Sequence, residues 1–434
     1  MPLNILIVGA GVGGPISAFL LLRSNPDHQI TVIERHPTLR ANGQQIDLRS
    51  HGIPMMRRLG LLDAVKAHAV DERGFQLVDE NGKVQATMTA NGTGEGRQAF
   101  TSDYEIMRGD LVNILYEESL KESGKAKGKG GIKYEFGVTV TELTQDDDGG
   151  AGVDVTFSNG KQGRYDVVIG ADGQYSKTRR QIFGQEVSDA CFKPLGVYST
   201  FFSVPAAEGR PEFAQVLHAP GGRMLATRPS RPDITGVYLM KAMGADAEEE
   251  EALRASLRQP VEQQKALWAK LYAGAGWQTD GLLREMQASD DFYAFSMAQV
   301  RLEHYARGRV ALLGDAGYVP SPATGMGTTL SILGAYVLAG ELARCDGGGG
   351  GGGDVPAALR AYEEAIRPLV RECHDSLPPG YPGTQIPQSA LGVSVLRWAA
   401  AFIAKFRVDK LITRLVPGNG SWTPPEYPEL KLDA

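Results

Sequence analysis

Cysteine is scarce in this chain of 434 residues, which contains only Cys191, Cys345 and Cys373. The three lie far apart and form no Cys-x-x-Cys pair, so the sequence gives no sign of a disulfide framework or a zinc site. Their distribution suits a reducing compartment, and we expect a cytoplasmic protein. His-Glu-x-x-His and Gly-x-Ser-x-Gly motifs are also missing, so we expect neither a metalloprotease nor a serine hydrolase, and no bound metal.

An excess of positive charge is missing as well. The chain carries 45 Lys and Arg against 51 Asp and Glu, a net charge of -6, which gives no reason to expect nucleic acid as a partner. The apolar start "LNILIVGAGVGG" lacks the basic beginning of a signal peptide. The apolar segment Ser389–Phe406 is interrupted by Arg397 and Lys405, so we expect a packing helix and no membrane contact. The oligomeric state is left open.

Glycine, in contrast, is abundant and occurs in motifs. Residues 9–14 read Gly-Ala-Gly-Val-Gly-Gly, after an apolar strand and before an apolar helix. This pattern predicts a dinucleotide site, in which Gly9 permits the turn, Gly11 lets a pyrophosphate reach backbone amides and Gly14 lets the helix pack close to the strand. The second strand ends at Glu34 and Arg35. A carboxylate at Glu34 suits ribose hydroxyls and disfavours a 2′-phosphate, so FAD or NAD is predicted here.

Two later segments have the same strand-then-turn character, "YDVVIGADG" (residues 165–173) and "RVALLGDAG" (residues 309–317). A Gly- and Pro-rich loop follows the second, with Pro320, Pro322 and the run Gly325-Met326-Gly327, and we predict that Pro322 and all three residues of this run contact the cofactor. FAD needs such a returning segment to cover its isoalloxazine, which lies far from the adenine, whereas a nicotinamide dehydrogenase does not. We expect the Pro322 turn to approach the flavin ring, with the next helix directing its positive end at the ring. Glycines at 325 and 327 would leave room for the ring.

The order of these segments predicts an α/β fold with a Rossmann-type FAD-binding domain in three pieces, interleaved with a β-sheet substrate domain. We place the FAD-binding pieces at residues 1–74, 105–187 and 299–373, and the substrate pieces at 75–104 and 188–298. Residues 374–434 form a C-terminal helical segment and tail. Asn81-Gly82 indicates a hairpin, Ala247–Tyr272 one helix, and the glycine run 347–353 a surface loop.

Taken together, these motifs resemble the single-component flavin-dependent monooxygenases related to p-hydroxybenzoate hydroxylase. The segments "GQQIDLRSHG" (residues 43–52) and "GMGTTLSILGAYVLAGEL" look most similar to the tetracycline-inactivating branch and its fungal and actinobacterial relatives. The resemblance implies that Asp172-Gly173 serves both FAD and a visiting NAD(P)H. It also implies that Asp315 bonds the ribityl chain and that Arg108, at the start of a helix, contacts FAD.

The resemblance implies the reaction too. NADPH or NADH would reduce the flavin, which would add O2 to give a C4a-hydroperoxide and oxygenate a phenolic or polycyclic small molecule. Hydroxylation, epoxidation and Baeyer–Villiger insertion all remain open, and no side chain is assigned as catalytic. An FAD reductase or dehydrogenase of the same fold and a non-catalytic flavin-binding module are the alternatives.

Other positions are candidates for contact with the substrate or depart from the family pattern. Gln45, His218 and Arg223 are predicted to contact substrate. Asp47 and Arg49 either face the isoalloxazine or NAD(P)H, or only pair with each other on the surface. Three residues replace those usual in the family: Tyr318 for histidine, Thr329 for asparagine and Gly334 for aspartate.

Overall fold

The computed structural model describes residues 1–40, 43–70, 72–89, 104–126, 128–145, 152–209, 211–347, 354–378, 381, 383–406 and 422–432. The predicted glycine loop therefore lies outside the described residues, apart from Gly347.

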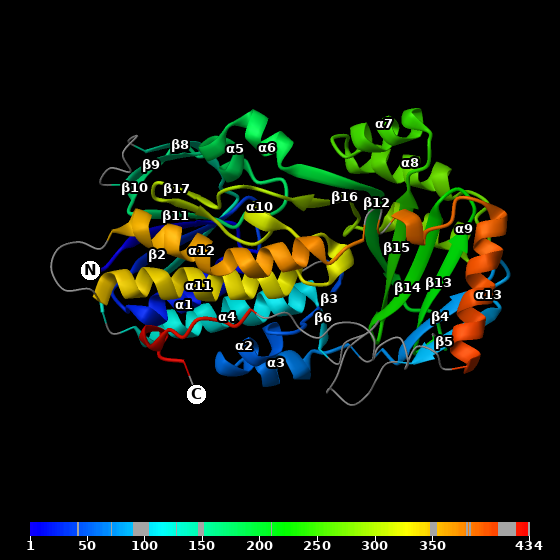
Figure 1. Ribbon diagram of the computed structural model, residues 1–434, viewed down its shortest axis with the longest axis horizontal. Helices are drawn as coiled ribbons and strands as arrows, with labels where there is room; N and C mark the ends of the chain where they lie inside the picture. Colours follow the sequence, from blue (N-terminus) through cyan, green and yellow to red (C-terminus); the bar gives the residue numbers. More distant parts are fainter. Residues whose placement is uncertain are drawn as a thin grey trace.

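A six-stranded sheet forms the centre of one half of the molecule (Figure 1). Its order is β17 (Ala306–Arg307), β18 (Val310–Leu312), β11 (Val167–Gly170), β1 (Asn4–Val8), β2 (Gln29–Glu34) and β7 (Gly131–Phe136). All neighbours are parallel except β17 and β18. Because β1, β11 and β18 are buried along their whole length or nearly so, they read as continuous apolar runs.

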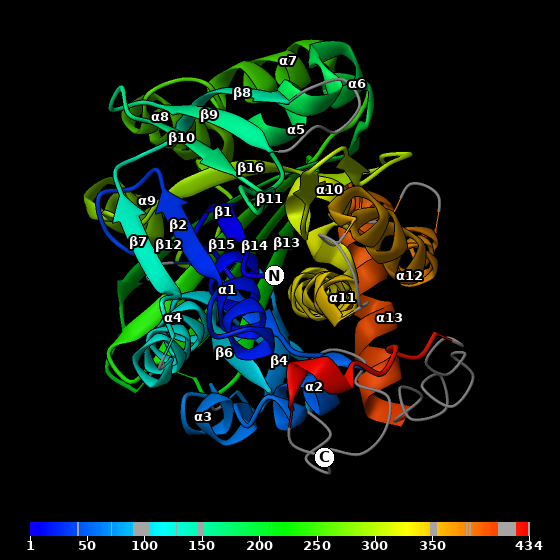
Figure 2. The same ribbon diagram turned by 90° about the vertical axis from the view of Figure 1, so that its left-hand side faces the viewer.

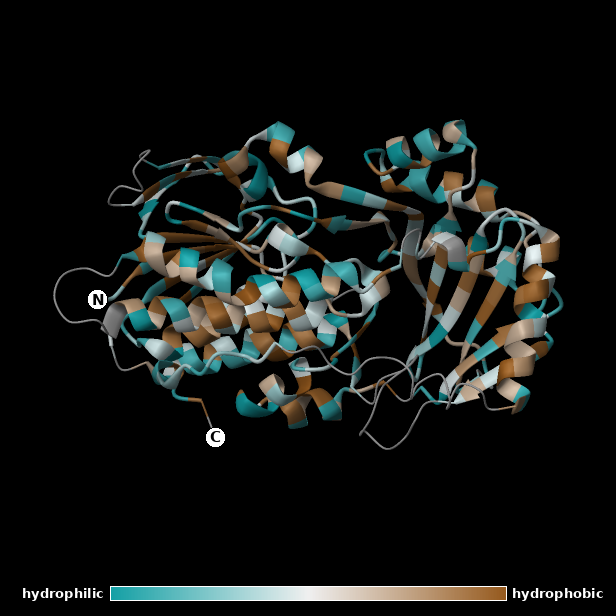
Figure 3. Cartoon of the chain, in the orientation of Figure 1, coloured by the Kyte–Doolittle hydropathy of each residue, from teal (hydrophilic) through white to brown (hydrophobic). Residues whose placement is uncertain are grey.

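Helices cover one face of this sheet, as the end-on view in Figure 2 shows. Helix α1 (Gly13–Ser24) packs between α4 (Arg108–Lys125) and α11 (Gly327–Gly347), and α12 (Val355–Asp375) packs on α11. Helices α2 (Gly52–Arg58) and α3 (Leu62–Ala67) lie near the same layer. Hydrophobic residues concentrate in the sheet and in α11 (Figure 3), because both are enclosed by other elements.

The opposite side carries a three-stranded antiparallel sheet, β10 (Gln162–Tyr165), β9 (Val153–Phe157) and β8 (Val140–Gln145). Helices α5 (Lys177–Phe183) and α6 (Gln185–Ala190) follow it, and α5 contacts β8.

A seven-stranded sheet forms the other half (Figure 1). Its order is β16 (Tyr293–Val300), β12 (Phe192–Pro205), β15 (Ile234–Ala242), β14 (Arg223–Arg231), β13 (Ala214–Ala219), β4 (Gly74–Val78) and β5 (Val84–Thr89). The predicted Asn-Gly hairpin joins β4 and β5, and β4 pairs in parallel with β13. The predicted fold class, in which pieces of one α/β unit alternate with a separate β-sheet, is confirmed; the exact domain boundaries stay predictions.

The prediction of a single helix over Ala247–Tyr272 is wrong. The structure has α7 (Ala247–Ser256) and α8 (Val261–Tyr272), because Pro260 interrupts the helix and precedes the first residue of α8. A further helix, α9 (Thr279–Ala288), joins them over one face of the seven-stranded sheet. The packing helix predicted near the C-terminus is α13 (Ala390–Phe406), which lies on β5 and β13. Among the described residues, no helix has the length and hydropathy needed to cross a membrane.

One buried arginine joins two of the predicted cofactor loops. Arg179, at 3% exposure, donates hydrogen bonds to the carbonyl oxygens of Ala316 (2.8 Å) and Gln174 (2.9 Å) and to Ser188 Oγ (3.1 Å). Gln174 follows the Asp172-Gly173 turn, and Ala316 follows Asp315. The guanidinium group therefore holds the ends of β11 and β18 together from behind.

We expect Arg179→Met to lower the free energy of unfolding by on the order of 3 kcal/mol, because two buried carbonyl oxygens lose a charged donor. Arg180→Met is the matched control, since the next arginine along the chain is exposed. Urea unfolding of both variants measures the difference, and equal losses would show that Arg179 does not support the loops.

Candidate functional site

Two cavities lie end to end at the carboxyl ends of the parallel strands. The larger has a volume of about 340 Å³ and the smaller about 240 Å³. Both are lined by Gly11, Arg108, Ala171 and Gly173, so they meet at this point. Because these loops follow different strands of one parallel sheet, they converge at one edge, where such folds bind ligands.

The smaller cavity is built around Glu34, at the end of β2. The Glu34 carboxylate accepts hydrogen bonds from the backbone N–H groups of Ala10 and His36, both at 3.0 Å, which fix its position beside the glycine turn. A Cβ at Gly9 would lie 2.5 Å from the carbonyl oxygen of Ala171, and a Cβ at Gly14 would collide with the carbonyl oxygen of Gly9. The predicted roles of these glycines in tight turning and close packing fit this geometry.

Positive charge gathers where the cavities meet. Arg108, the first residue of α4, lines both cavities, and Arg40 and Arg35 line the smaller one. The Arg40 guanidinium lies 5.5 Å from the centre of the Tyr293 ring. Burial and the neighbouring charge of Arg108 lower the pKa of Arg40, so an anion placed between them would relieve their repulsion. Sequence analysis missed Arg40, because it belongs to no motif.

The Asp172-Gly173 turn also lies at this junction. The Asp172 carboxylate accepts hydrogen bonds from Ser176 Oγ at 2.5 Å, Thr178 N at 3.0 Å and Thr178 Oγ1 at 3.1 Å, which organise the start of α5. Gly173 has a φ of +79° and lines both cavities. The turn is thus shaped by its own hydrogen bonds, and its contact with a cofactor stays a prediction.

The larger cavity contains Asp315 and the beginning of α11. Burial raises the pKa of Asp315 to about 6, although the charge of Arg108 opposes this rise. Pro322, Gly325 and Gly327 line the same cavity. Met326 does not line it and instead packs against the hydrophobic core.

The loop before α11 is held from behind in an uncommon conformation. Ser321 is buried with a φ of +86°, in a region that residues other than glycine rarely adopt. Gln299 donates a 3.2 Å hydrogen bond to the carbonyl oxygen of Pro320, and His374 Nε2 lies 3.1 Å from that of Val319. This support keeps the loop against the cavity.

One face of the seven-stranded sheet forms the opposite wall. Its lining side chains come from four adjacent strands and are mostly aromatic or thioether groups: Ser199, Phe201, Arg228, Tyr238, Met240, Tyr293, Phe295 and Met297. Alternate residues of β16 and β15 point to this face, as expected for the two-residue period of a strand.

His218 and Arg223 lie away from both cavities. His218 is buried beside Arg397 of α13, and burial lowers its pKa to about 4. Arg223 donates to the carbonyl oxygens of Pro220 and Leu271, at 2.8 and 3.3 Å. Arg223 lies on the opposite face of the sheet from its neighbour Met224, which pairs with the cavity-lining Met240. His218 pairs with Met224 and lies on the chamber face, but α13 covers that part of the sheet. Neither position supports the predicted contact with substrate.

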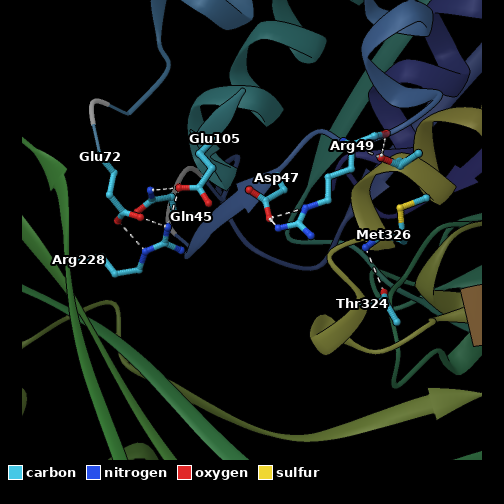
Figure 4. A network of polar contacts seen from close by, with 9 residues as sticks. Gln45, Asp47, Arg49, Glu72, Glu105, Arg228, Thr324 and Met326 are labelled. Carbon is cyan, nitrogen blue, oxygen red and sulfur yellow. Dashed lines mark hydrogen bonds and ion pairs between the residues drawn. The ribbon is translucent and has the colours of Figure 1, made fainter. Parts of the chain in front are cut away.

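Gln45, Asp47 and Arg49 lie at the chamber, in a polar network that Figure 4 shows. Gln45 and Asp47 line the cavity, and Asp47 forms a 2.6 Å ion pair with Arg49. A Cβ on Gly325 would lie 3.0 Å from the Arg49 guanidinium carbon, so this pair borders the glycine loop. Asp47 and Arg49 therefore pair with each other, as one of the two predicted alternatives has it, but the pair lies at the cavity and not on the outer surface.

The network continues into residues that sequence analysis missed. Arg228 donates to both oxygens of Glu72, at 2.9 and 2.7 Å, and to Glu105 Oε2 at 2.6 Å. Gln45 Nε2 donates to the same Glu105 oxygen at 2.7 Å. These residues come from four segments that are distant in sequence. The one signal in the sequence that could have indicated them is the presence of charged residues within otherwise apolar strands.

The departures from the family pattern have structural reasons. A Cβ at position 334 would collide with the Tyr318 hydroxyl, so Gly334 makes room for the tyrosine that replaces histidine. Tyr318 Oη lies 2.9 Å from that of Tyr362, which donates to the carbonyl oxygen of Leu312. Thr329 faces the Arg49 turn, where its hydroxyl donates to the carbonyl oxygen of Arg49 at 3.0 Å.

The fold and the double cavity define a dinucleotide-binding protein with an adjoining chamber for a small ligand. The sequence profile described as "FAD binding domain" matches residues 3–376, and the chain belongs to that family. Its relatives include the FAD-dependent monooxygenase asL6 of Sarocladium schorii, 40% identical over 442 residues and covering 100% of both chains. The flavin-dependent monooxygenase eupH of Phoma sp is 35% identical, with 94% and 93% covered.

Among solved structures, the tetracycline destructase Tet(51) superposes with a TM-score of 0.73 at 25% identity, covering 97% of this chain and 100% of that one. The chain is accordingly a flavoprotein monooxygenase that binds FAD. The predicted recognition and enzyme class are confirmed.

The residues present fit this cofactor. A Cβ on Gly11 would press on Arg108 Nη2 at 3.3 Å, and one on Gly327 would have Asp315 Oδ1 as its nearest neighbour at 3.7 Å, so a side chain at either position would occupy the space beside these two charged groups. Glu34 offers a carboxylate to ribose hydroxyls at one end, Arg40 and Arg108 offer charge to a pyrophosphate, and Asp315 offers an acceptor beyond it.

Asp315→Asn should separate cofactor binding from stability. The folded pKa of Asp315 lies above its ordinary value, so its ionisation opposes folding, and this cost is complete above about pH 6 and absent below about pH 4. We expect the FAD-free variant to be more stable than wild type at pH 8, by on the order of 2–3 kcal/mol, and equal to it near pH 4. FAD affinity should fall at least about tenfold at pH 8. Denaturant titrations with and without FAD measure both; unchanged affinity would remove Asp315 from the cofactor site.

Two glycine variants test the loop at the start of α11. Gly327→Val places its Cβ in the cavity at ordinary van der Waals distance from Asp315 Oδ1 (3.7 Å), so we expect a normally stable apoprotein with reduced FAD content. Gly325→Val should destabilise the apoprotein itself, because its φ is +66° and Arg49 is in the way. Melting temperatures without FAD and bound flavin absorbance distinguish the two. A Gly327→Val protein with full FAD content would show that the cofactor does not reach α11.

Proposed function

We propose that this monooxygenase uses NADPH or NADH as a transient co-substrate, together with O2, to oxygenate a phenolic or polycyclic small molecule in the cytoplasm. The three cysteines lie far apart in the sequence and form no Cys-x-x-Cys pair, which agrees with a reducing compartment. The solved structures most similar in fold include proteins named tetracycline destructases, and that name refers to a polycyclic compound.

The observation that carries the proposal is the composition of the chamber. Its sheet wall offers Phe201, Tyr238, Tyr293 and Phe295, flat surfaces against which fused or aromatic rings can pack. Asp315 and the N-terminal end of α11 lie in the same cavity, so a bound ring would lie next to the FAD site. A large apolar pocket with a few polar groups is typical of small-molecule sites.

Polar groups in this wall suit a phenol or enol oxygen. Among the described residues, Arg228 uses Nε and Nη2 for its carboxylate partners, which leaves Nη1 able to donate to a ligand. Gln45 Oε1 is buried and has no donor within the described part of the chain. A hydroxyl group that donates to Gln45 and accepts from Arg228 would satisfy both.

FAD bound in the two cavities supplies the redox chemistry, which is activation of O2 after reduction by NAD(P)H. The chain's own residues would bind the cofactor, orient the substrate and enclose the reacting atoms. Glu34, Arg40 and Arg108 would hold the nucleotide part, Asp315 the chain that links it to the ring, and the aromatic wall would exclude water from the reacting atoms.

A substrate screen tests the proposal. The FAD-loaded protein is mixed with phenols and polycyclic compounds under ¹⁸O₂, and NADPH or NADH oxidation is followed together with product mass. Substrate-stimulated oxidation with one labelled oxygen in the product is the expected result. Reduction of substrate without label would favour the reductase alternative, and failure to take up FAD would favour a binding module.

Arg228→Lys tests the recognition of an oxygen atom by this wall. Lysine keeps the charge between Glu72 and Glu105 but lacks the fixed Nη1 donor, so we expect KM for a substrate found in the screen to rise about tenfold or more. FAD content should not change. Arg231→Lys is the control, since that side chain is about half exposed and pairs with Asp110. Equal KM values in both variants would exclude Arg228 from substrate binding.

A further inference from the structure

Three carboxyl groups and two guanidinium groups meet at the edge of the chamber. Asp47 and Glu105 lie directly opposite each other in the two-stranded ladder of β3 (Gln45–Asp47) and β6 (Glu105–Met107). Glu72 precedes β4, Arg49 follows β3 and Arg228 lies on β14. Figure 4 shows Glu105 between the Arg228 group and Asp47.

The pairing of these groups leaves one carboxyl in excess. Arg49 is paired with Asp47 Oδ2 at 2.6 Å, and Arg228 is paired through two hydrogen bonds with Glu72. Glu105 shares Nη2 of the same Arg228. Three carboxylates against two cations would leave one uncompensated negative charge at a place where Glu105 is 3% exposed, which is costly. Among the described residues, Tyr238 also packs here, and it stays neutral because burial raises its pKa to about 12.

A buried acceptor points to where the extra proton lies. Asp47 Oδ1 is buried and, in the part of the chain that the structure describes, receives no hydrogen bond if both carboxyls are ionised. A proton on Glu105 would supply that hydrogen bond and remove the excess charge. Burial raises the pKa of Glu105 to about 8; Arg228 opposes this rise, and the carboxyl of Asp47 adds to it.

We propose that Asp47 and Glu105 form a carboxyl pair that shares one proton at neutral pH, and that this pair is the proton donor of the chamber. Asp47 lines the cavity, whereas Glu105 lies behind it, so the proton can be stored out of solvent and presented at Asp47. A carboxyl group whose pKa is raised by burial and by a neighbouring carboxylate is a known source of acid chemistry near pH 7.

The proposal rests on the proposed function only in placing FAD and O2 in this chamber. When O2 oxidises anionic reduced FAD to yield H2O2, two electrons and one proton come from the flavin and a second proton must come from elsewhere. The pair supplies it: a carboxyl O–H bond breaks, an O–H bond forms on the reduced oxygen, and the pair is left ionised until it takes a proton from solvent.

The shared proton is tested first without cofactor or substrate. Glu105→Gln carries an amide that imitates the protonated carboxyl, since it can donate to Asp47 and accept from Arg228. Because the folded pKa of Glu105 lies above its unfolded one, wild type should lose stability relative to this variant as pH rises, by about tenfold in the folding constant per pH unit between pH 5 and 8. A difference that is constant over this range overturns the proposal. Asp47→Asn serves as a second variant if Glu105→Gln does not fold.

The donor role is tested by re-oxidation of the FAD-loaded, photoreduced protein with O2 in stopped flow. The wild-type rate should fall as pH rises through 8, while the rate of Glu105→Gln should be at least about tenfold lower at pH 7 and independent of pH between 6 and 9. Asp63→Asn, which removes an almost fully exposed carboxyl, should keep the wild-type profile. A wild-type profile in Glu105→Gln overturns the donor role even if the stability result holds. Neither measurement uses a substrate, so both can succeed when the ¹⁸O₂ experiment fails, or the reverse.

Discussion

The convergence of parallel strands at one edge of a sheet is the constraint on which the rest of this protein depends. β1, β11 and β18 are adjacent and parallel, so the turns at Gly9, Gly173 and Gly314 meet although each is more than a hundred residues from the next in sequence. No long side chain could bring these turns together as closely as the backbone does. Arg179 then fixes two of them by bonding carbonyl oxygens that follow each turn.

The interleaved chain gives this edge its second wall. Two excursions from the six-stranded sheet supply the seven-stranded sheet, and β4 from the first pairs with β13 from the second. The chamber therefore lies between two units that are each built from separated pieces of the chain. Aromatic side chains from one sheet face Asp315 and the start of α11 from the other unit, an arrangement that needs both units in place.

The wall of the chamber contains several buried charged side chains, and most of them are paired. Arg228, Glu72 and Glu105 are largely withdrawn from solvent, and the cost of their burial is offset by short hydrogen bonds among them and with Gln45. Within the described part of the chain no hydrogen bond reaches the Asp315 carboxyl group, and burial raises its pKa although the charge of Arg108 opposes the rise. A buried acceptor of this kind is costly to stability in the free protein and useful when a ligand brings donors.

The sequence by itself determined the class of fold and the enzyme family, because glycine turns after apolar strands have a chemistry that can be read from neighbouring residues. It also predicted that Glu34, Arg108 and Asp315 hold FAD, and the structure brings these three residues to the same pair of cavities. Tertiary structure alone decided the chamber. His218 and Arg223 looked suitable in sequence, but Arg223 lies on the other face of its strand and His218 lies under α13, and only the packing of the sheet and helices decides this. No motif contains Arg40, Arg228, Glu72 or Glu105. Their roles depend on their distances from one another and on their burial, and both arise only when separate segments of the chain meet.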